Sequence, residues 1–176
     1  MTTEPMHESG MVFGPYPEGS CFYIERCETY QSIQDGVKIA EFLLLRHFQN
    51  DPTVWIVEAK SSTPRPETQP NFDNFIEEIR EKFINALTLS VAACLRRHST
   101  YEELPKPFQT LDLKTTKFRF ILVINGHDEK WLPPIQEALK QALYPTVKTW
   151  NLSPTSVVVL NNVMARSQGL ISEPCN

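Results

Sequence analysis

The stretch TVWIVEAKSS, residues 53–62, combines the composition of a buried strand with an acid and a base near its end. Its β-branched and aromatic residues favour a strand. Side chains alternate across a strand, so Ile56, Glu58 and Lys60 share one face. The sequence therefore predicts that a carboxylate and an ammonium group project in the same direction from one end of a core strand.

A second acid interrupts the preceding apolar stretch, GVKIAEFLLLR, residues 36–46. If this stretch is also a strand, the same alternation groups Glu41 with Leu43 and Leu45. Burying two carboxylates close together raises the pKa of at least one of them unless a cation lies between them. Lys60 would supply part of that positive charge, and a divalent metal ion would supply the rest.

The remaining segments predict alternating strands and helices. Strands are expected at 21–27, 36–46, 53–62, 117–126 and 156–161, and helices at 71–98 and 131–143. Residues 47–52 predict a turn between two antiparallel strands, and the proline-rich residues 62–70 predict a loop. The order β-β-β-α-β-α-β predicts an α/β domain with a mixed β-sheet flanked by helices.

The first twenty residues predict an irregular N-terminal arm, because glycine and proline recur there at a spacing that suits neither regular element. Residues 21–176 then form one domain, a length that provides a sizeable core. The four cysteines form no CxxC pair, and MTTEPMHESG lacks the regions of a signal peptide, which predicts a cytoplasmic protein with reduced thiols. No apolar run approaches the roughly 20 residues of a membrane helix, so no contact with a membrane is expected.

Glu41, sixteen intervening residues and then Glu58-Ala59-Lys60 at the end of an apolar strand resemble the active-site pattern of the PD-(D/E)XK nuclease superfamily. The order of strands and helices is also similar, and the resemblance covers roughly residues 21–126. It implies a restriction-endonuclease-like fold and a nuclease that hydrolyses phosphodiester bonds of nucleic acid, with DNA as the expected substrate.

The resemblance also implies a role for each residue. Glu41, Glu58 and the Ala59 carbonyl would bind Mg²⁺ or Mn²⁺ as hard oxygen ligands, and a water on that ion would become the nucleophile. Lys60 would orient this water and neutralise charge that develops on the phosphorus.

Some assignments stay open. Asp35, just before the second predicted strand, competes with Glu41, because the first acid of the family is usually Asp. The family often has a further acid on an initial helix, and Glu25 or Glu28 could take that place. Retention of catalysis is open too, since the Glu substitution and the formal charge of -4 also fit a nuclease-fold interaction module without activity, acting as the small subunit of a larger complex.

The charge balance bears on partners. With 17 basic residues against 21 acidic ones and no appended DNA-binding module, the chain alone is poorly equipped to hold a phosphate backbone. The sequence therefore predicts a homodimer or a complex with a larger nucleic-acid-binding protein, formed through the 72–98 helix or the KFRF region, residues 117–120.

Overall fold

The core of the molecule is a five-stranded mixed sheet, seen in a computed structural model that describes residues 1–48 and 51–172. The strands lie in the order β3 (Cys21–Phe22), β4 (Phe42–Phe48), β5 (Asp51–Lys60), β6 (Lys117–Ile124) and β7 (Val157–Asn161). The pairs β3–β4 and β4–β5 are antiparallel, whereas β5–β6 and β6–β7 are parallel. The predicted α/β class and the mixed sheet flanked by helices are confirmed.

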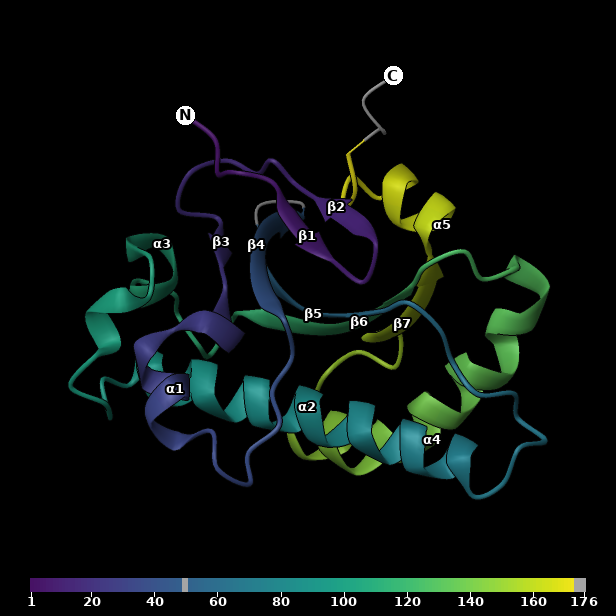
Figure 1. Cartoon of the computed structure of the whole chain (residues 1–176). Helices are drawn as coiled ribbons and strands as arrows, with labels where there is room; N and C mark the ends of the chain where they lie inside the picture. Colours follow the sequence, from purple (N-terminus) through teal and green to yellow (C-terminus); the bar gives the residue numbers. More distant parts are fainter. Residues whose placement is uncertain (49–50, 173–176) are drawn as a thin grey trace.

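Helices cover one face of this sheet (Figure 1). The two long ones, α2 (Asn71–Cys94) and α4 (Leu132–Thr149), connect β5 to β6 and β6 to β7, as parallel neighbours require. The apolar stripe of α2 packs into the core on this face, where the Phe83 and Phe120 ring centroids lie 5.4 Å apart. The prediction was accurate for the start of α2. It was too short for α4, which continues through Pro145.

A hairpin and a short helix cover the opposite face, where the sequence predicted only an irregular arm for residues 1–20 (Figure 1). The hairpin consists of β1 (Met6–Glu8) and β2 (Met11–Phe13), and the helix is α5 (Asn162–Ser167). The hairpin forms because Ser9 and Gly10 both have positive φ, at 51° and 75°, as a two-residue hairpin turn needs. Phe13 is fully buried, so this segment belongs to the core.

The strand predicted at 21–27 is wrong beyond Phe22. The chain turns instead into a 3₁₀ helix, η1 (Ile24–Arg26), and then into α1 (Glu28–Ile33). The cause lies far along the chain: the Glu103 carboxylate accepts hydrogen bonds from Glu28 N at 2.6 Å and Thr29 N at 3.1 Å, which satisfies the free N–H groups at the start of α1.

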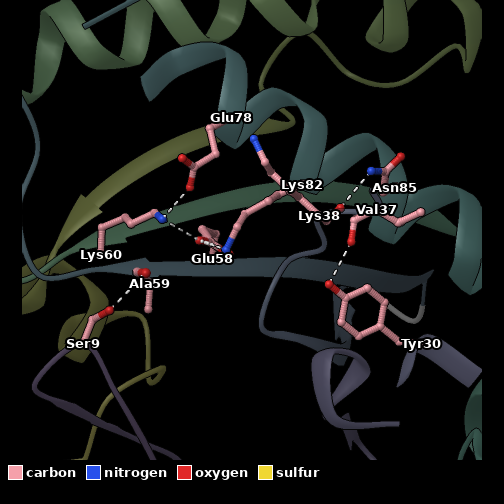
Figure 2. A network of polar contacts seen from close by, with 10 residues as sticks. All are labelled: Ser9, Tyr30, Val37, Lys38, Glu58, Ala59, Lys60, Glu78, Lys82 and Asn85. Atoms are coloured by element: carbon pink, nitrogen blue, oxygen red, sulfur yellow. Dashed lines mark hydrogen bonds and ion pairs between the residues drawn. The ribbon is translucent and has the colours of Figure 1, made fainter. Parts of the chain in front are cut away.

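The strand predicted at 36–46 begins later than expected, at Phe42. Residues 37 and 38 do not pair with a strand, because their carbonyls accept hydrogen bonds from the Tyr30 hydroxyl at 2.8 Å and from Asn85 Nδ2 at 2.8 Å (Figure 2). The segment before β4 is therefore held by side chains of α1 and α2.

The remaining elements are short. They are η2 (Tyr101–Glu103), α3 (Lys106–Gln109) and η3 (Glu129–Trp131). Strands β4 and β5 extend into the turn predicted at 47–52, of which residues 49–50 lie outside the described part of the chain. Cys21, Cys27 and Cys94 are free thiols, and Cys175 lies outside the described residues. Among the described helices, none has the length and apolar character needed to cross a membrane.

Candidate active site

Glu58 and Lys60 leave β5 on the face that α2 covers. Ile56, two positions earlier, packs in the core cluster beneath α2, and alternation along the strand directs Glu58 and Lys60 to the same layer. Helix α2 adds Glu78 and Lys82, which lie one turn apart on one side of the helix. Figure 2 shows Lys60, Glu78 and Lys82 gathered around Glu58.

Glu58 is the centre of this arrangement and has no exposed surface. Its Oε1 accepts a hydrogen bond from Lys82 Nζ at 2.8 Å and lies 3.4 Å from Lys60 Nζ. Its Oε2 has no hydrogen-bond partner among the described residues. A buried carboxylate thus has one oxygen between two cations and a second oxygen without a partner.

The ionisation of Glu58 and that of Lys82 depend on each other. Burial raises the pKa of Glu58, and the Lys82 and Lys60 ammonium groups act against that shift. Burial also lowers the pKa of Lys82, but the acidic neighbours Glu58, Glu41 and Glu25 together outweigh burial, so that the pKa of Lys82 is raised overall. The two ammonium groups at 2.8 and 3.4 Å favour the ionised form of Glu58, and the Glu58 carboxylate in turn favours the charged form of Lys82.

Glu41 lies beside this group, just before β4. Its N–H donates to Val57 O at 3.0 Å, and its side chain is almost entirely buried. Burial, the Glu25 carboxyl and the Glu58 charge raise the pKa of Glu41 to about 9. Glu41 is therefore protonated at neutral pH, and its Oε2, like that of Glu58, has no hydrogen-bond partner in the described part of the chain.

Lys60 is held between two acids. Its Nζ donates to Glu78 Oε1 at 2.9 Å, and the same nitrogen lies 3.4 Å from Glu58 Oε1. The side chain remains about a quarter exposed, at 24%. The ammonium group is thus oriented by α2 and still reaches solvent at the edge of the buried pair.

Ala59 lies between Glu58 and Lys60 in the sequence, and its side chain points to the opposite face of β5. Its methyl group packs on the hairpin side, in the same cluster as Phe13 and Phe42. Its carbonyl, predicted as a metal ligand, accepts a hydrogen bond from Ser9 Oγ at 3.1 Å (Figure 2). The turn of the β1–β2 hairpin therefore contacts the carbonyl that the sequence assigned to the metal.

The three alternative acids differ in position. Glu28, the first residue of α1, is exposed. Asp35 lies exposed in the turn after α1 and makes no ion pair with Lys60 or Lys82. Glu25, in η1, lies near Glu41: its N–H donates to Glu41 O at 3.3 Å, and its carboxyl helps to raise the pKa of Glu41. The structure therefore brings together Glu41, Glu58, Lys60 and Glu25, and leaves Asp35 apart.

Sequence analysis missed the contribution of α2. Glu78 and Lys82 are spaced i, i+4 beside the apolar residues Ile79 and Phe83, which form the apolar stripe of the helix. The available signal was the position of Lys82 at the border of the apolar stripe. A lysine there, above a strand with a buried acid, is placed to pair with that acid.

The suitability of the site for a metal ion can be judged from its donor atoms. Glu41 and Glu58 each offer an unpartnered, buried carboxylate oxygen, the hard ligand that Mg²⁺ and Mn²⁺ prefer. Within residues 1–48 and 51–172, however, no group of three or more His, Cys, Asp and Glu side chains is arranged to hold a metal ion. The donor chemistry fits a divalent cation, and in the present arrangement Lys60 and Lys82 supply the positive charge.

Comparison with known proteins identifies no relative: no protein-family model, no curated protein and no solved structure matches this chain. The function must be inferred from the chemistry of the site.

Proposed function

We propose that this chain is a metal-dependent nuclease of PD-(D/E)XK type, with Glu41, Glu58 and Lys60 as its active-site residues and DNA as its expected substrate. The observation that supports this most strongly is the pair of buried acids, each with an unpartnered oxygen, beside the half-buried ammonium group of Lys60. Burying unpartnered carboxylate oxygens lowers the stability of the fold. Acids with strongly shifted pKa values are concentrated at functional sites.

The order of the elements is compatible with this proposal. An antiparallel β3–β4–β5 arrangement precedes the helical crossover α2 and the parallel strand β6. In the PD-(D/E)XK family the first acid lies on the second core strand, and the paired acid and lysine lie on the third. Here Glu41 comes directly before β4, and Glu58 and Lys60 lie at the end of β5, which supports the proposal.

In the proposed mechanism each residue has a defined task. The unpartnered oxygens of Glu41 and Glu58 would hold Mg²⁺ or Mn²⁺, an ion that supplies an activated water and a positive charge for the phosphate. Glu41 must lose its proton to act as a ligand. Because its pKa is raised to about 9, this loss is opposed at neutral pH and becomes easier as the pH rises.

Lys60 would supply the positive charge that stabilises the phosphate as negative charge develops on it. Glu78 holds this ammonium group at 2.9 Å and limits its range of orientation. Lys82, bonded to Glu58 at 2.8 Å, keeps this carboxylate in place inside the apolar core. Lys82 is therefore assigned as a positioning residue.

A second candidate, the interaction module without activity, is favoured by two specific contacts. Lys82 Nζ donates a hydrogen bond to Glu58 Oε1, and the Ser9 hydroxyl donates one to the Ala59 carbonyl, so both of these oxygens already have a partner. In that case the buried acids and lysines would have a structural role only, and the chain would act as the small subunit of a larger complex.

A protein partner would contact α2 and not the KFRF region, residues 117–120. The KFRF region cannot provide an aromatic contact surface, because Phe118 and Phe120 are buried in the core. A homodimer or a larger nucleic-acid-binding partner would instead contact the outer side of α2. A cytoplasmic location remains part of the proposal and rests on the sequence.

Cleavage of labelled single- and double-stranded DNA and RNA, with Mg²⁺ or Mn²⁺, tests the proposal. The unchanged protein is expected to cut at least one substrate, and Lys60→Ala to lower the rate by about 100-fold or more, because Lys60 acts on the transition state. Lys140→Ala, which removes an exposed lysine from α4, is the matched control and should keep full activity.

Two outcomes would contradict the proposal. Equal cleavage by the unchanged protein and Lys60→Ala would place the activity elsewhere. A complete lack of metal-dependent cleavage on all four substrates would favour the interaction module.

A further inference from the structure

A large groove lies at the end of the sheet where β5 and β6 begin, remote from the site described above. It has a volume of about 910 Å³, within the range of small-molecule sites, and is lined by strands β4, β5 and β6 and by the loops beside them. We call it the arginine groove, after Arg46 and Arg119, which lie on either side of Trp55.

Both guanidinium groups stack on the same indole. The guanidinium carbon of Arg46 lies 4.3 Å from the Trp55 ring centroid, and that of Arg119 lies 5.3 Å from it. Trp55 is buried, with 7% of its surface exposed, so the two arginines form its cover. Both arginines, from the strands on either side of β5, line the same groove.

The two arginines are fixed in place without a counter-charge. Arg46 donates to Gln168 O at 2.7 Å and Gly169 O at 2.9 Å, and Arg119 donates to Thr155 O at 3.4 Å. In the described part of the chain, neither forms an ion pair with a carboxylate, whereas Lys117 in the same groove is paired with Asp51 at 2.7 Å. Each guanidinium group has five N–H donors, so several remain free.

This combination favours an oxyanion that accepts several hydrogen bonds. Both arginines are half-buried, and that burial lowers the pKa of each, a sign that their charges are partly desolvated. Desolvated cations without a partner cost free energy that a bound anion would recover. Phosphate suits two adjacent guanidinium forks, which bind it through paired hydrogen bonds.

The rim of the groove adds flat apolar surface. Trp150, at the end of α4, is 42% exposed, and Phe48, at the end of β4, is 70% exposed. Exposed aromatic rings beside a phosphate site provide stacking surfaces for a nucleobase. A ligand with a phosphate and a base satisfies both features.

We propose that the arginine groove binds a nucleotide, with its phosphate on Arg46 and Arg119 and its base against Trp150 or Phe48. This inference is independent of the nuclease proposal. Trp55 and Lys60 project from opposite faces of β5, so the nucleotide would not contact Glu58.

Titration calorimetry with AMP and ADP tests the proposal, in a buffer that contains EDTA so that no metal ion takes part. The intact protein is expected to bind ADP, and Arg119→Gln to weaken binding by about 10-fold or more, because a charge-assisted contact to phosphate is lost. Arg97→Gln removes the same charge from an exposed position outside the groove and should bind as the intact protein does.

A second variant tests the base. Trp150→Ala should weaken ADP binding while leaving the weaker binding of inorganic phosphate unchanged, which a general loss of folding would not do. Among the described residues, the side chain of Arg119 makes a single long hydrogen bond, at 3.4 Å, so its substitution should leave the fold intact.

Three results would overturn the proposal. These are no ADP binding by the intact protein, equal binding by Arg119→Gln, or phosphate binding as tight as ADP binding. Tighter binding of a single-stranded oligonucleotide than of AMP or ADP, lost in Arg119→Gln, would assign the groove to a nucleic-acid strand instead.

Discussion

Ionisation of the buried Glu41 carboxyl in the candidate site would lower the stability of the folded protein. In an unfolded chain its carboxyl would titrate near 4.5, whereas in the folded protein burial, Glu25 and Glu58 raise its pKa to about 9. A raised carboxyl pKa means that the folded state keeps a proton that the unfolded state releases. The stabilisation from this proton is complete below about pH 4.5 and is lost as the pH rises through about 9.

Glu41→Gln should therefore raise the free energy of unfolding at about pH 8, because Gln resembles the protonated acid at every pH. After allowance for screening by water, we expect a gain of about 2 kcal/mol at about pH 8 and little change at about pH 5. Urea denaturation at both pH values measures it. Glu18→Gln, at an exposed position, is the control, and an equal gain in both variants would refute the assigned cause.

At the scale of elements, the segment before β4 depends on two side-chain contacts from helices. The Tyr30 hydroxyl and Asn85 Nδ2 bond the carbonyls of Val37 and Lys38, and this segment leads directly into Glu41. Helix α2 therefore supplies Lys82 and Glu78 to the site and also fixes the backbone on the far side of it.

Asn85→Ala should loosen this segment. Losing one hydrogen bond of about 1 kcal/mol should speed amide exchange of residues 38–41 by about 5-fold, with β6 unaffected. Hydrogen exchange followed by mass spectrometry or NMR measures it. Thr88→Ala, on the same helix, removes a hydroxyl that bonds only Ile84 O of its own helix, and equal effects of the two variants would contradict the role of Asn85.

These contacts also explain what the sequence could and could not predict. Strand β5 and helix α2 were predicted because their apolar periodicity is local and strong. The end of β3 at Phe22 and the helix α1 were not, because Glu103, more than 70 residues away, supplies the carboxylate at the start of α1. Likewise Glu41, Glu58 and Lys60 could be selected from their spacing, whereas the pairing of Lys82 with Glu58 depends on how α2 packs on the sheet.

At the scale of the whole molecule, the sheet has a complete layer on each face. Helices α1, α2 and α4 cover one face, and the β1–β2 hairpin with α5 covers the other (Figure 1). The hairpin also brings Ser9 to the Ala59 carbonyl, so the N-terminal segment contributes to the core and reaches the candidate site.

Phe13→Ala should therefore destabilise the protein strongly. Phe13 is fully buried, and its ring centroid lies 5.4 Å from that of Phe42, so we expect a loss of about 3–4 kcal/mol. Thermal or chemical denaturation measures it. Phe48→Ala, at a ring that is 70% exposed, should change stability by less than about 0.5 kcal/mol. A similarly small effect of Phe13→Ala would mean that residues 1–20 are a dispensable arm after all.

A calorimetric titration with Mn²⁺ at about pH 8 tests most directly the claim that Glu41 and Glu58 form a divalent-metal site. The intact protein and Glu18→Gln should bind Mn²⁺ alike, with release of a proton because Glu41 must ionise. Glu41→Gln should bind at least about 10-fold more weakly, as it lacks one of the two carboxylate ligands. No Mn²⁺ binding by the intact protein, or equal binding by Glu41→Gln, would contradict the claim.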